Sequence, residues 1–150
     1  MKKYKLTNEI IEIDGYTLHR IRALRDFDDV RKGDLGGFVE SERNLSHEGN
    51  CWVSGNAKVY EDALVSDNAK IYGNVLVSYN AWVFGNARVS DNVKVSDNVR
   101  VSGNAKVYEN AWICGDAWIY GNTWICGDAK VSGNVNVCGD TKLSGNARIF

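Results

Sequence analysis

Residues 112–134 read WICGDAWIYGNTWICGDAKVSGN, and most features of this stretch return after six residues. Trp112, Trp118 and Trp124 are six residues apart, each preceded by a small residue and followed by isoleucine. A period of six places equivalent residues about 240° apart around an α-helix, so it cannot give a helix one apolar stripe. The stretch therefore predicts a repeated scaffold of short strands.

The same period extends from residue 49 to residue 150, which divide into seventeen hexads without an insertion. Position three is always Ala, Val, Thr or Cys, and position five is always Val, Ile or Leu. Side chains two residues apart share one face of a strand, so positions three and five point inward and positions four and six point outward. Positions one and two, mostly Gly, Asp, Glu and Asn, predict a corner; a left-handed backbone there would explain the row of Asn residues.

A small residue two places before an aliphatic one, every six residues, resembles the hexapeptide-repeat left-handed parallel β-helix. The resemblance implies three hexads per triangular coil, hence 18 residues between stacked positions, and a left-handed winding. We therefore expect an all-β fold, a single-stranded parallel β-helix over 49–150. The "GDLGGF" lead-in before the hexads is similar to uncharacterised bacterial and phage members that are labelled transferases, a label that rests on fold.

Residues 1–48 precede the regular hexads and predict a small β cap on the first coil. Two apolar runs flank Asp14-Gly15, a typical hairpin turn. Gly36-Gly37 predicts a tight bend before Phe38. Residues 43–45 are in phase with the hexads and predict a degraded first turn, in which His47 has an inward phase.

Composition narrows the classes of function. The formal net charge of -1 argues against binding duplex DNA. No secretory or membrane-spanning segment is recognisable, so we expect a cytoplasmic protein that does not bind membranes. Cys114, Cys126 and Cys138 would lie on different faces and stay reduced, and Cys51 points inward. The Cys and His spacing predicts no metal site and no cofactor.

Residues 18 apart should stack on one face, which predicts two candidate binding surfaces. The first is an aromatic face of Trp82, Phe84, Arg100, Trp118 and Tyr120, in which Arg100 lies one strand from each tryptophan. The second is a cationic face of Lys70, Tyr72, Arg88, Lys106 and Tyr108, suited to anions or single-stranded nucleic acid. Its three stacked cations would repel one another unless a carboxylate or a bound anion intervenes.

The two histidines decide how strongly the sequence indicates an enzyme. Hexapeptide-repeat acyltransferases, which this repeat resembles, use a histidine as general base between the subunits of a trimer. Here His19 and His47 both precede the hexads, and no histidine lies within them. If the chain is an enzyme, one of these two is the catalytic residue.

Three functions follow. We favour a non-enzymatic structural or protein-binding solenoid that acts through the aromatic face and an uncapped C-terminal coil. The alternatives are an acyltransferase-like enzyme, and a phage-type inhibitor or ligand-binding protein that uses the cationic face. An uncovered last coil also predicts a homo-oligomer, either a trimer or an end-to-end dimer, with a protein partner as a further option.

Overall fold

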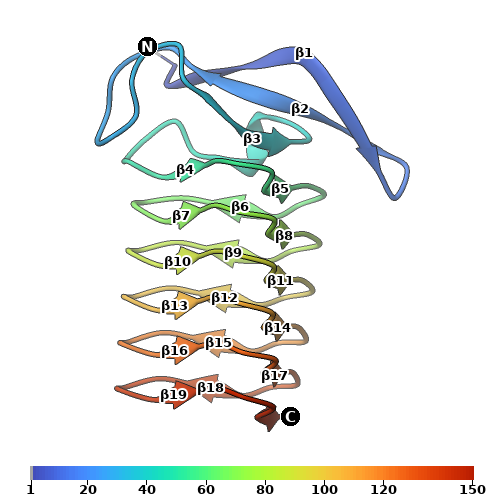
Figure 1. The fold of residues 1–150 in the computed structure, drawn as a ribbon, viewed down its shortest axis with the longest axis vertical. Coiled ribbons are helices and arrows are strands. Elements are labelled where there is room, and N and C mark those ends of the chain that lie inside the picture. Colours follow the sequence, from blue (N-terminus) through green and yellow to red (C-terminus); the bar gives the residue numbers. More distant parts are fainter. Residues whose placement is uncertain (1) are drawn as a thin grey trace.

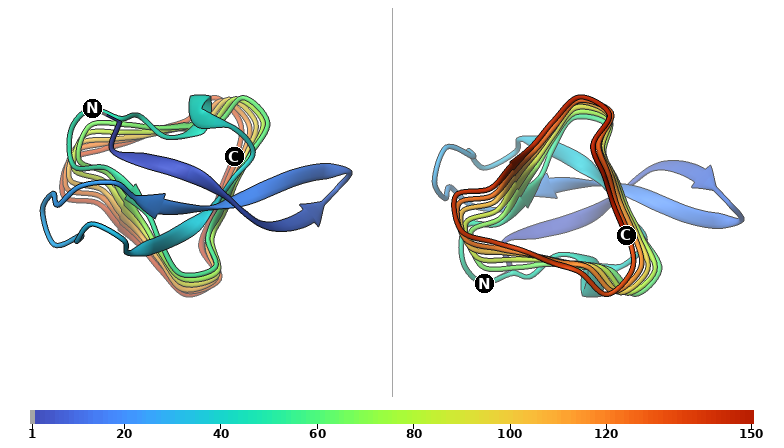
Figure 2. Two further views of the ribbon diagram at one scale, coloured as in Figure 1. Left: turned by 90° about the horizontal axis from the view of Figure 1, so that it is seen from above. Right: turned by 90° about the horizontal axis from the view of Figure 1, so that it is seen from below.

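The computed structural model describes residues 2–150 as a triangular prism of parallel coils beneath a β cap (Figure 1). Seen from the N-terminal end in Figure 2, the coils turn counter-clockwise as they recede, so the solenoid is left-handed. It has about six turns. The all-β parallel β-helix predicted from the hexads is confirmed.

Seventeen two-residue strands, one per hexad, form the three walls of the prism. One wall contains β4 (Trp52–Val53), β7 (Lys70–Ile71), β10 (Arg88–Val89), β13 (Lys106–Val107), β16 (Trp124–Ile125) and β19 (Lys142–Leu143). The second contains β5 (Lys58–Val59), β8 (Leu76–Val77), β11 (Lys94–Val95), β14 (Trp112–Ile113), β17 (Lys130–Val131) and β20 (Arg148–Ile149). The third contains β6 (Leu64–Val65), β9 (Trp82–Val83), β12 (Arg100–Val101), β15 (Trp118–Ile119) and β18 (Asn136–Val137).

Strand partners are 18 residues apart, as in Arg88 against Lys70 and Lys106. Positions three and five fill the interior of the prism; Ala81 and Val83, for example, are both fully buried. Burying one such valine stabilises the fold by about 1.5–3 kcal/mol relative to leaving it in water. The core thins in the last coil, where Leu143 and Ile149 are only partly buried.

The corners differ from the prediction. The left-handed backbone lies at position one, at Gly55 (φ 64°) and Asp91 (φ 66°) for example, and not at the Asn of position two. The Asn side chains instead form a ladder in which each amide donates to the side chain one coil further. One such chain runs from Asn68 through Asn86 and Asn104. Hydrogen bonding between coils, rather than tolerance of positive φ, therefore explains this row.

The acidic residues at position one also have a role that the sequence did not indicate. The carboxylates of Asp67, Asp91, Asp97 and Glu109 each accept the backbone N–H of position one in the next coil, at 2.8–3.2 Å. These carboxylates therefore join successive coils along the corner.

The cap consists of β1 (Tyr4–Ile13), β2 (Tyr16–Ala23), β3 (Leu35–Val39) and the short 3-10 helix η1 (Glu42–Asn44). The hairpin around Asp14-Gly15 is confirmed by the antiparallel pairing of β1 with β2. The predicted tight bend at Gly36-Gly37 is wrong, because both glycines lie within β3 and neither has a positive φ. Strand β3 pairs in parallel with β5, so the second wall continues into the cap.

The degraded turn is present but two residues out of register. The hexad phase would place Leu45 opposite Ala63, whereas Leu45 bridges to Val65, a position-five residue. Leu45 is fully buried and occupies the inward place predicted for His47. The imidazole of His47 instead packs on Tyr4 of the cap and is 26% exposed, so the inward phase assigned to it is wrong.

Candidate functional site

Outward side chains stack in rows along the three walls, and the tryptophans of the opening stretch do not converge. Trp112, Trp118 and Trp124 lie on β14, β15 and β16, one on each wall. Each is between 38% and 45% exposed. The regular spacing of these residues therefore distributes the aromatic surface around the prism.

The predicted aromatic face lies on β9, β12 and β15 and contains two aromatic pairs. Trp82 stacks on Phe84 with ring centroids 4.1 Å apart, and Trp118 lies 5.0 Å from Tyr120. Arg100 pairs in register with both tryptophans, and its guanidinium lies 5.9 Å from the Trp118 ring. The structure thus brings these five residues onto one surface.

Serine hydroxyls orient both tryptophans of this surface. The Trp82 indole N–H donates to Ser66 Oγ at 2.8 Å, and the Trp118 indole N–H donates to Ser102 Oγ at 3.3 Å. The sequence places both serines on this wall but does not indicate that they hydrogen-bond to the tryptophans. The signal that could have revealed these hydrogen bonds is a serine at position six, sixteen residues before each tryptophan.

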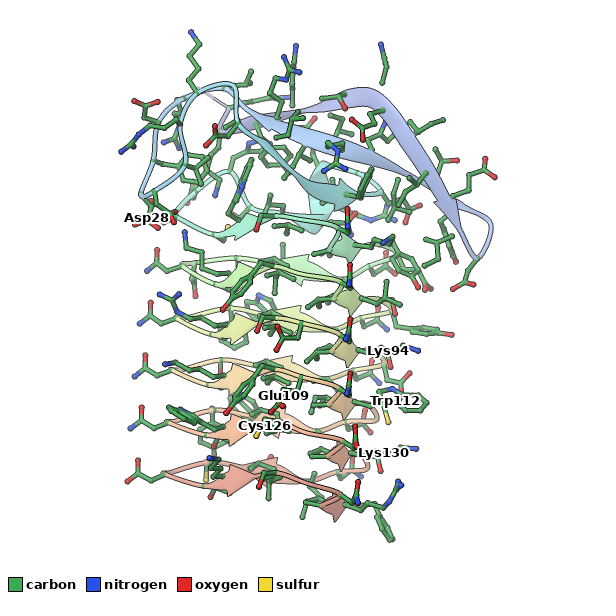
Figure 3. All side chains as sticks on the ribbon, in the orientation of Figure 1. Asp28, Lys94, Glu109, Trp112, Cys126 and Lys130 are labelled. Atoms are coloured by element: carbon green, nitrogen blue, oxygen red, sulfur yellow. The ribbon has the colours of Figure 1, made fainter. Side chains whose placement is uncertain are left out.

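On the other two walls, cations bracket the exposed tryptophans. Lys94 and Lys130 place their ammonium groups 6.0 Å and 4.4 Å from the Trp112 ring (Figure 3). Lys106 and Lys142 lie 5.1 Å and 5.6 Å from Trp124. Each such cation–π interaction contributes about 0.5–1 kcal/mol at an exposed site.

The predicted cationic face carries less free charge than its sequence implied, because the cap contributes carboxylates. Lys70 Nζ lies 2.7 Å from Asp28 and 3.9 Å from Asp29. Hydrogen bonding to Lys70 holds the pKa of Asp28 below its usual range. Within residues 2–150, neither Arg88 nor Lys106 forms an ion pair, so the free positive charge begins one coil below Lys70.

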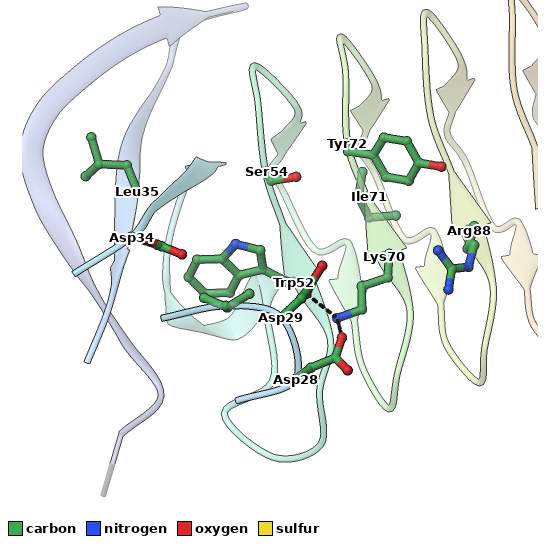
Figure 4. A pocket seen from close by; sticks show the side chains of 11 residues that line it. Asp28, Asp29, Asp34, Leu35, Trp52, Ser54, Lys70, Ile71, Tyr72 and Arg88 are labelled. Atoms are coloured by element: carbon green, nitrogen blue, oxygen red, sulfur yellow. Dashed lines mark hydrogen bonds and ion pairs between the residues drawn. The ribbon is translucent and has the colours of Figure 1, made fainter. Parts of the chain in front are cut away.

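The tyrosines of this face differ in their surroundings. Tyr72 is 40% exposed and lies on the second coil, next to Ser54 of the first (Figure 4). Tyr108 packs edge-on against Trp124 with ring centroids 6.4 Å apart. Hydrogen bonding to the Cys126 thiol raises the pKa of Tyr108 to about 12. The ring of Tyr72 is therefore more accessible to a ligand than the ring of Tyr108.

Both histidines belong to the cap. His47 stacks on Tyr4 at 4.2 Å; its Nδ1 accepts the backbone N–H of Lys3 at 3.1 Å, and its Nε2 donates to Glu42 at 2.7 Å. Nδ1 of His19 donates to the Thr7 carbonyl at 3.0 Å. Both nitrogens of His47 are thus engaged within the chain. A role as general base would require one of these contacts to open.

The four cysteines are free thiols. Cys114, Cys126 and Cys138 follow β14, β16 and β18, which lie on three different walls, as predicted. Cys51 is buried, as predicted, and its Sγ lies 3.3 Å from the ammonium group of Lys3. Across the described part of the chain, no group of three or more His, Cys, Asp or Glu side chains could hold a metal ion. No helix in that part is long and apolar enough to cross a membrane.

Comparison with known proteins gives one informative similarity. No family model matches the sequence. The chain is 36% identical over 74 residues to a protein described as the uncharacterized acetyltransferase YdcK of Escherichia coli (strain K12). The match covers 43% of this chain and 23% of that protein, so it spans less than a quarter of the relative's length. Seventeen consecutive hexads and their three-strand parallel coils show that the chain folds as a parallel β-helix.

Proposed function

We propose that this chain is a non-enzymatic binding scaffold whose aromatic face, formed by Trp82, Phe84, Arg100, Trp118 and Tyr120, contacts a protein surface. The observation that carries the proposal is the pairing of exposed rings on a rigid wall, with each indole N–H fixed by a serine. Because the rings are already ordered, a partner would bind them at little cost in side-chain entropy.

The partner that we propose first is a second copy of the chain. Trp, Tyr and Arg are the residues that most often dominate the energy of protein interfaces, and here Arg100 lies between the two tryptophans. A flat, periodic wall can pair with its own copy around a symmetry axis, so a trimer or a dimer would satisfy the proposal. The four free thiols support a location in a reducing compartment, which we propose is the cytoplasm.

Light scattering tests this proposal. The wild-type protein would be compared with the double variant Trp82→Ser/Trp118→Ser, and with Trp112→Ser/Trp124→Ser as a matched control from the other two walls. We expect an oligomer for the wild type and the control, and a folded monomer for the first variant. Equal masses for all three proteins would contradict self-association through the aromatic face.

The acetyltransferase name of the E. coli relative favours a second candidate, acetyl transfer. In this candidate His47 would act as the general base, oriented by Glu42 at 2.7 Å. Release of free thiol from acetyl-CoA would be measured with candidate hydroxyl and amine acceptors, for the wild type, His47→Ala and His19→Ala. Turnover that is lost only in His47→Ala, with the fold intact, would replace the scaffold proposal.

A further inference from the structure

Three hollows lie on the wall of β4, β7, β10 and β13, between the cap and Lys106, with volumes of about 540, 390 and 410 Å³. We refer to these three hollows together as the groove. Arg88 lines all three hollows, the first of which is shown in Figure 4. We propose that this groove binds an acidic sugar, with the sugar carboxylate on Arg88 and the ring against Tyr72.

The groove offers one place for an anion. Arg88 and Lys106 are register partners on adjacent strands, which lie about 4.8 Å apart. Both side chains line the second and third hollows, so a carboxylate bound there would offset the repulsion between the two cations. The planar fork of Arg88 can hold both oxygens of a carboxylate, while Lys106 supplies a second charge. Lys70 is unsuitable because it already binds Asp28 at 2.7 Å.

The total charge of the groove argues against a polyanion. Three cations line the hollows, and so do four carboxylates: Asp28, Asp29, Asp34 and Asp91. A nucleic acid strand would bring successive phosphates against these acids. A ligand with one negative charge and several hydroxyl groups would instead use the carboxylates as hydrogen-bond acceptors.

The upper part of the groove suits a sugar ring. The Tyr72 ring is 40% exposed and, within residues 2–150, has no aromatic neighbour in stacking contact, so one ring face can receive the C–H face of a sugar. Trp52 and Leu35 provide apolar surface beside the cap, and Ser54 provides a hydroxyl. Binding sites commonly combine apolar walls with a few fixed polar groups in this way.

This inference is independent of the proposed function, because the groove and the aromatic face lie on different walls. Isotope-labelled protein comprising residues 1–150 would be titrated, with backbone amide NMR chemical shifts as the readout. The ligands would be glucuronate, glucose, acetate and AMP, with a short oligogalacturonate to distinguish free from polymeric sugar. We expect saturable shifts at residues 71–73, 88–91 and 106–108. Glucuronate should bind at least about tenfold more tightly than glucose or acetate. Only glucuronate has both a carboxylate for Arg88 and Lys106 and a sugar ring for Tyr72.

Variants would locate the site. Arg88→Ala should weaken glucuronate binding by about tenfold or more, and Arg88→Lys by less, because lysine keeps the charge without the fork. Tyr72→Ala should also weaken it, whereas Arg148→Ala, an outward arginine on another wall, should leave it unchanged. Binding of acetate or glucose equal to that of glucuronate, tighter binding of AMP, absence of saturable shifts, or insensitivity to Arg88→Ala would each overturn the proposal.

Discussion

The ammonium group of Lys70 lies 2.7 Å from the carboxylate of Asp28, and this ion pair joins the second coil of the solenoid to the cap. It explains how stacked Lys70, Arg88 and Lys106 are tolerated at the top of the row. Asp28 also has a positive φ of 48°, which asparagine tolerates. Asp28→Asn therefore removes the charge and keeps the backbone.

We predict that Asp28→Asn lowers the free energy of unfolding by about 0.2–1 kcal/mol near neutral pH, a value typical of an exposed ion pair. Because Lys70 lowers the pKa of Asp28, its contribution is present above the ordinary value of 3.8 and is lost as the pH falls through the folded value. Urea unfolding at a series of pH values should show the two proteins converging below about pH 4. Asp29→Asn is the control, since Asp29 is 3.9 Å from Lys70 and should matter less. A difference in the free energy of unfolding between the two proteins that stays constant down to the lowest pH would contradict the role of the Asp28 carboxylate.

The glycines of β3 mark a close approach between the cap and the first coil. A Cβ on Gly36 would lie 2.6 Å from the side chain of Ile21 and from the Val53 carbonyl, and a Cβ on Gly37 would lie 2.6 Å from the Ala57 carbonyl. Gly36→Ala and Gly37→Ala should each destabilise the protein by about 1–3 kcal/mol. Thermal unfolding would measure the loss. The control is Gly145→Asn, at a left-handed corner with open space around it; a cost there as large as in β3 would show that the close approach is not responsible.

The corner carboxylates should stabilise the stacking of coils. Asp97 has a φ of 61° and accepts the Gly115 N–H at 2.8 Å. Asp97→Ala loses the acceptor and places alanine in a left-handed conformation, so we expect a loss of about 1–3 kcal/mol. Asp97→Asn keeps an oxygen acceptor and should cost less. Denaturant unfolding of both variants checks the order, and an equal loss in the two would count against the hydrogen bond.

Lys3 is fully buried and closes the N-terminal end of the prism. Its ammonium group donates to the carbonyls of Cys51 at 2.7 Å and Gly49 at 3.3 Å. Burial lowers the pKa of Lys3 and raises that of the Cys51 thiol. Lys3→Met should destabilise the fold by about 1–3 kcal/mol, because buried carbonyls lose their donor. Calorimetry would measure the melting temperature, with Lys5→Met as the control because Lys5 is exposed. Equal melting temperatures for the two variants would refute the role of Lys3 as a donor to buried carbonyls.

The sequence predicts the solenoid well because every hexad repeats the same local rule. A residue such as Val83 has an inward phase, and its neighbours 18 residues away have the same phase, so fold, register and the grouping of outward residues follow together. The membership of the aromatic face could be predicted for this reason. The rotamers that pair Trp82 with Phe84 could not, since they depend on a serine from the preceding coil.

Predictions were weakest where the cap meets the coils, because contacts there do not repeat. Trp52 has an outward phase, yet it is only 6% exposed, since Phe27 packs 5.3 Å from its ring. The neutralisation of Lys70 by Asp28 likewise joins residues 42 positions apart with no periodic relationship. The groove that we assign to an acidic sugar depends on both contacts, so it could not be found from the hexads alone.

The most direct test of the aromatic face as a contact surface uses a cysteine already present on it. Cys138 is exposed, and its hydrogen bonding to Tyr120 raises the pKa of that tyrosine. Maleimide labelling would be followed over a range of protein concentrations in the wild type and in Trp82→Ser/Trp118→Ser, with Cys114 on another wall as the internal reference. We predict that labelling of Cys138, but not of Cys114, slows several-fold in the wild type as the concentration rises, and stays fast in the variant. Equal labelling of Cys138 in both proteins at every concentration would contradict the account.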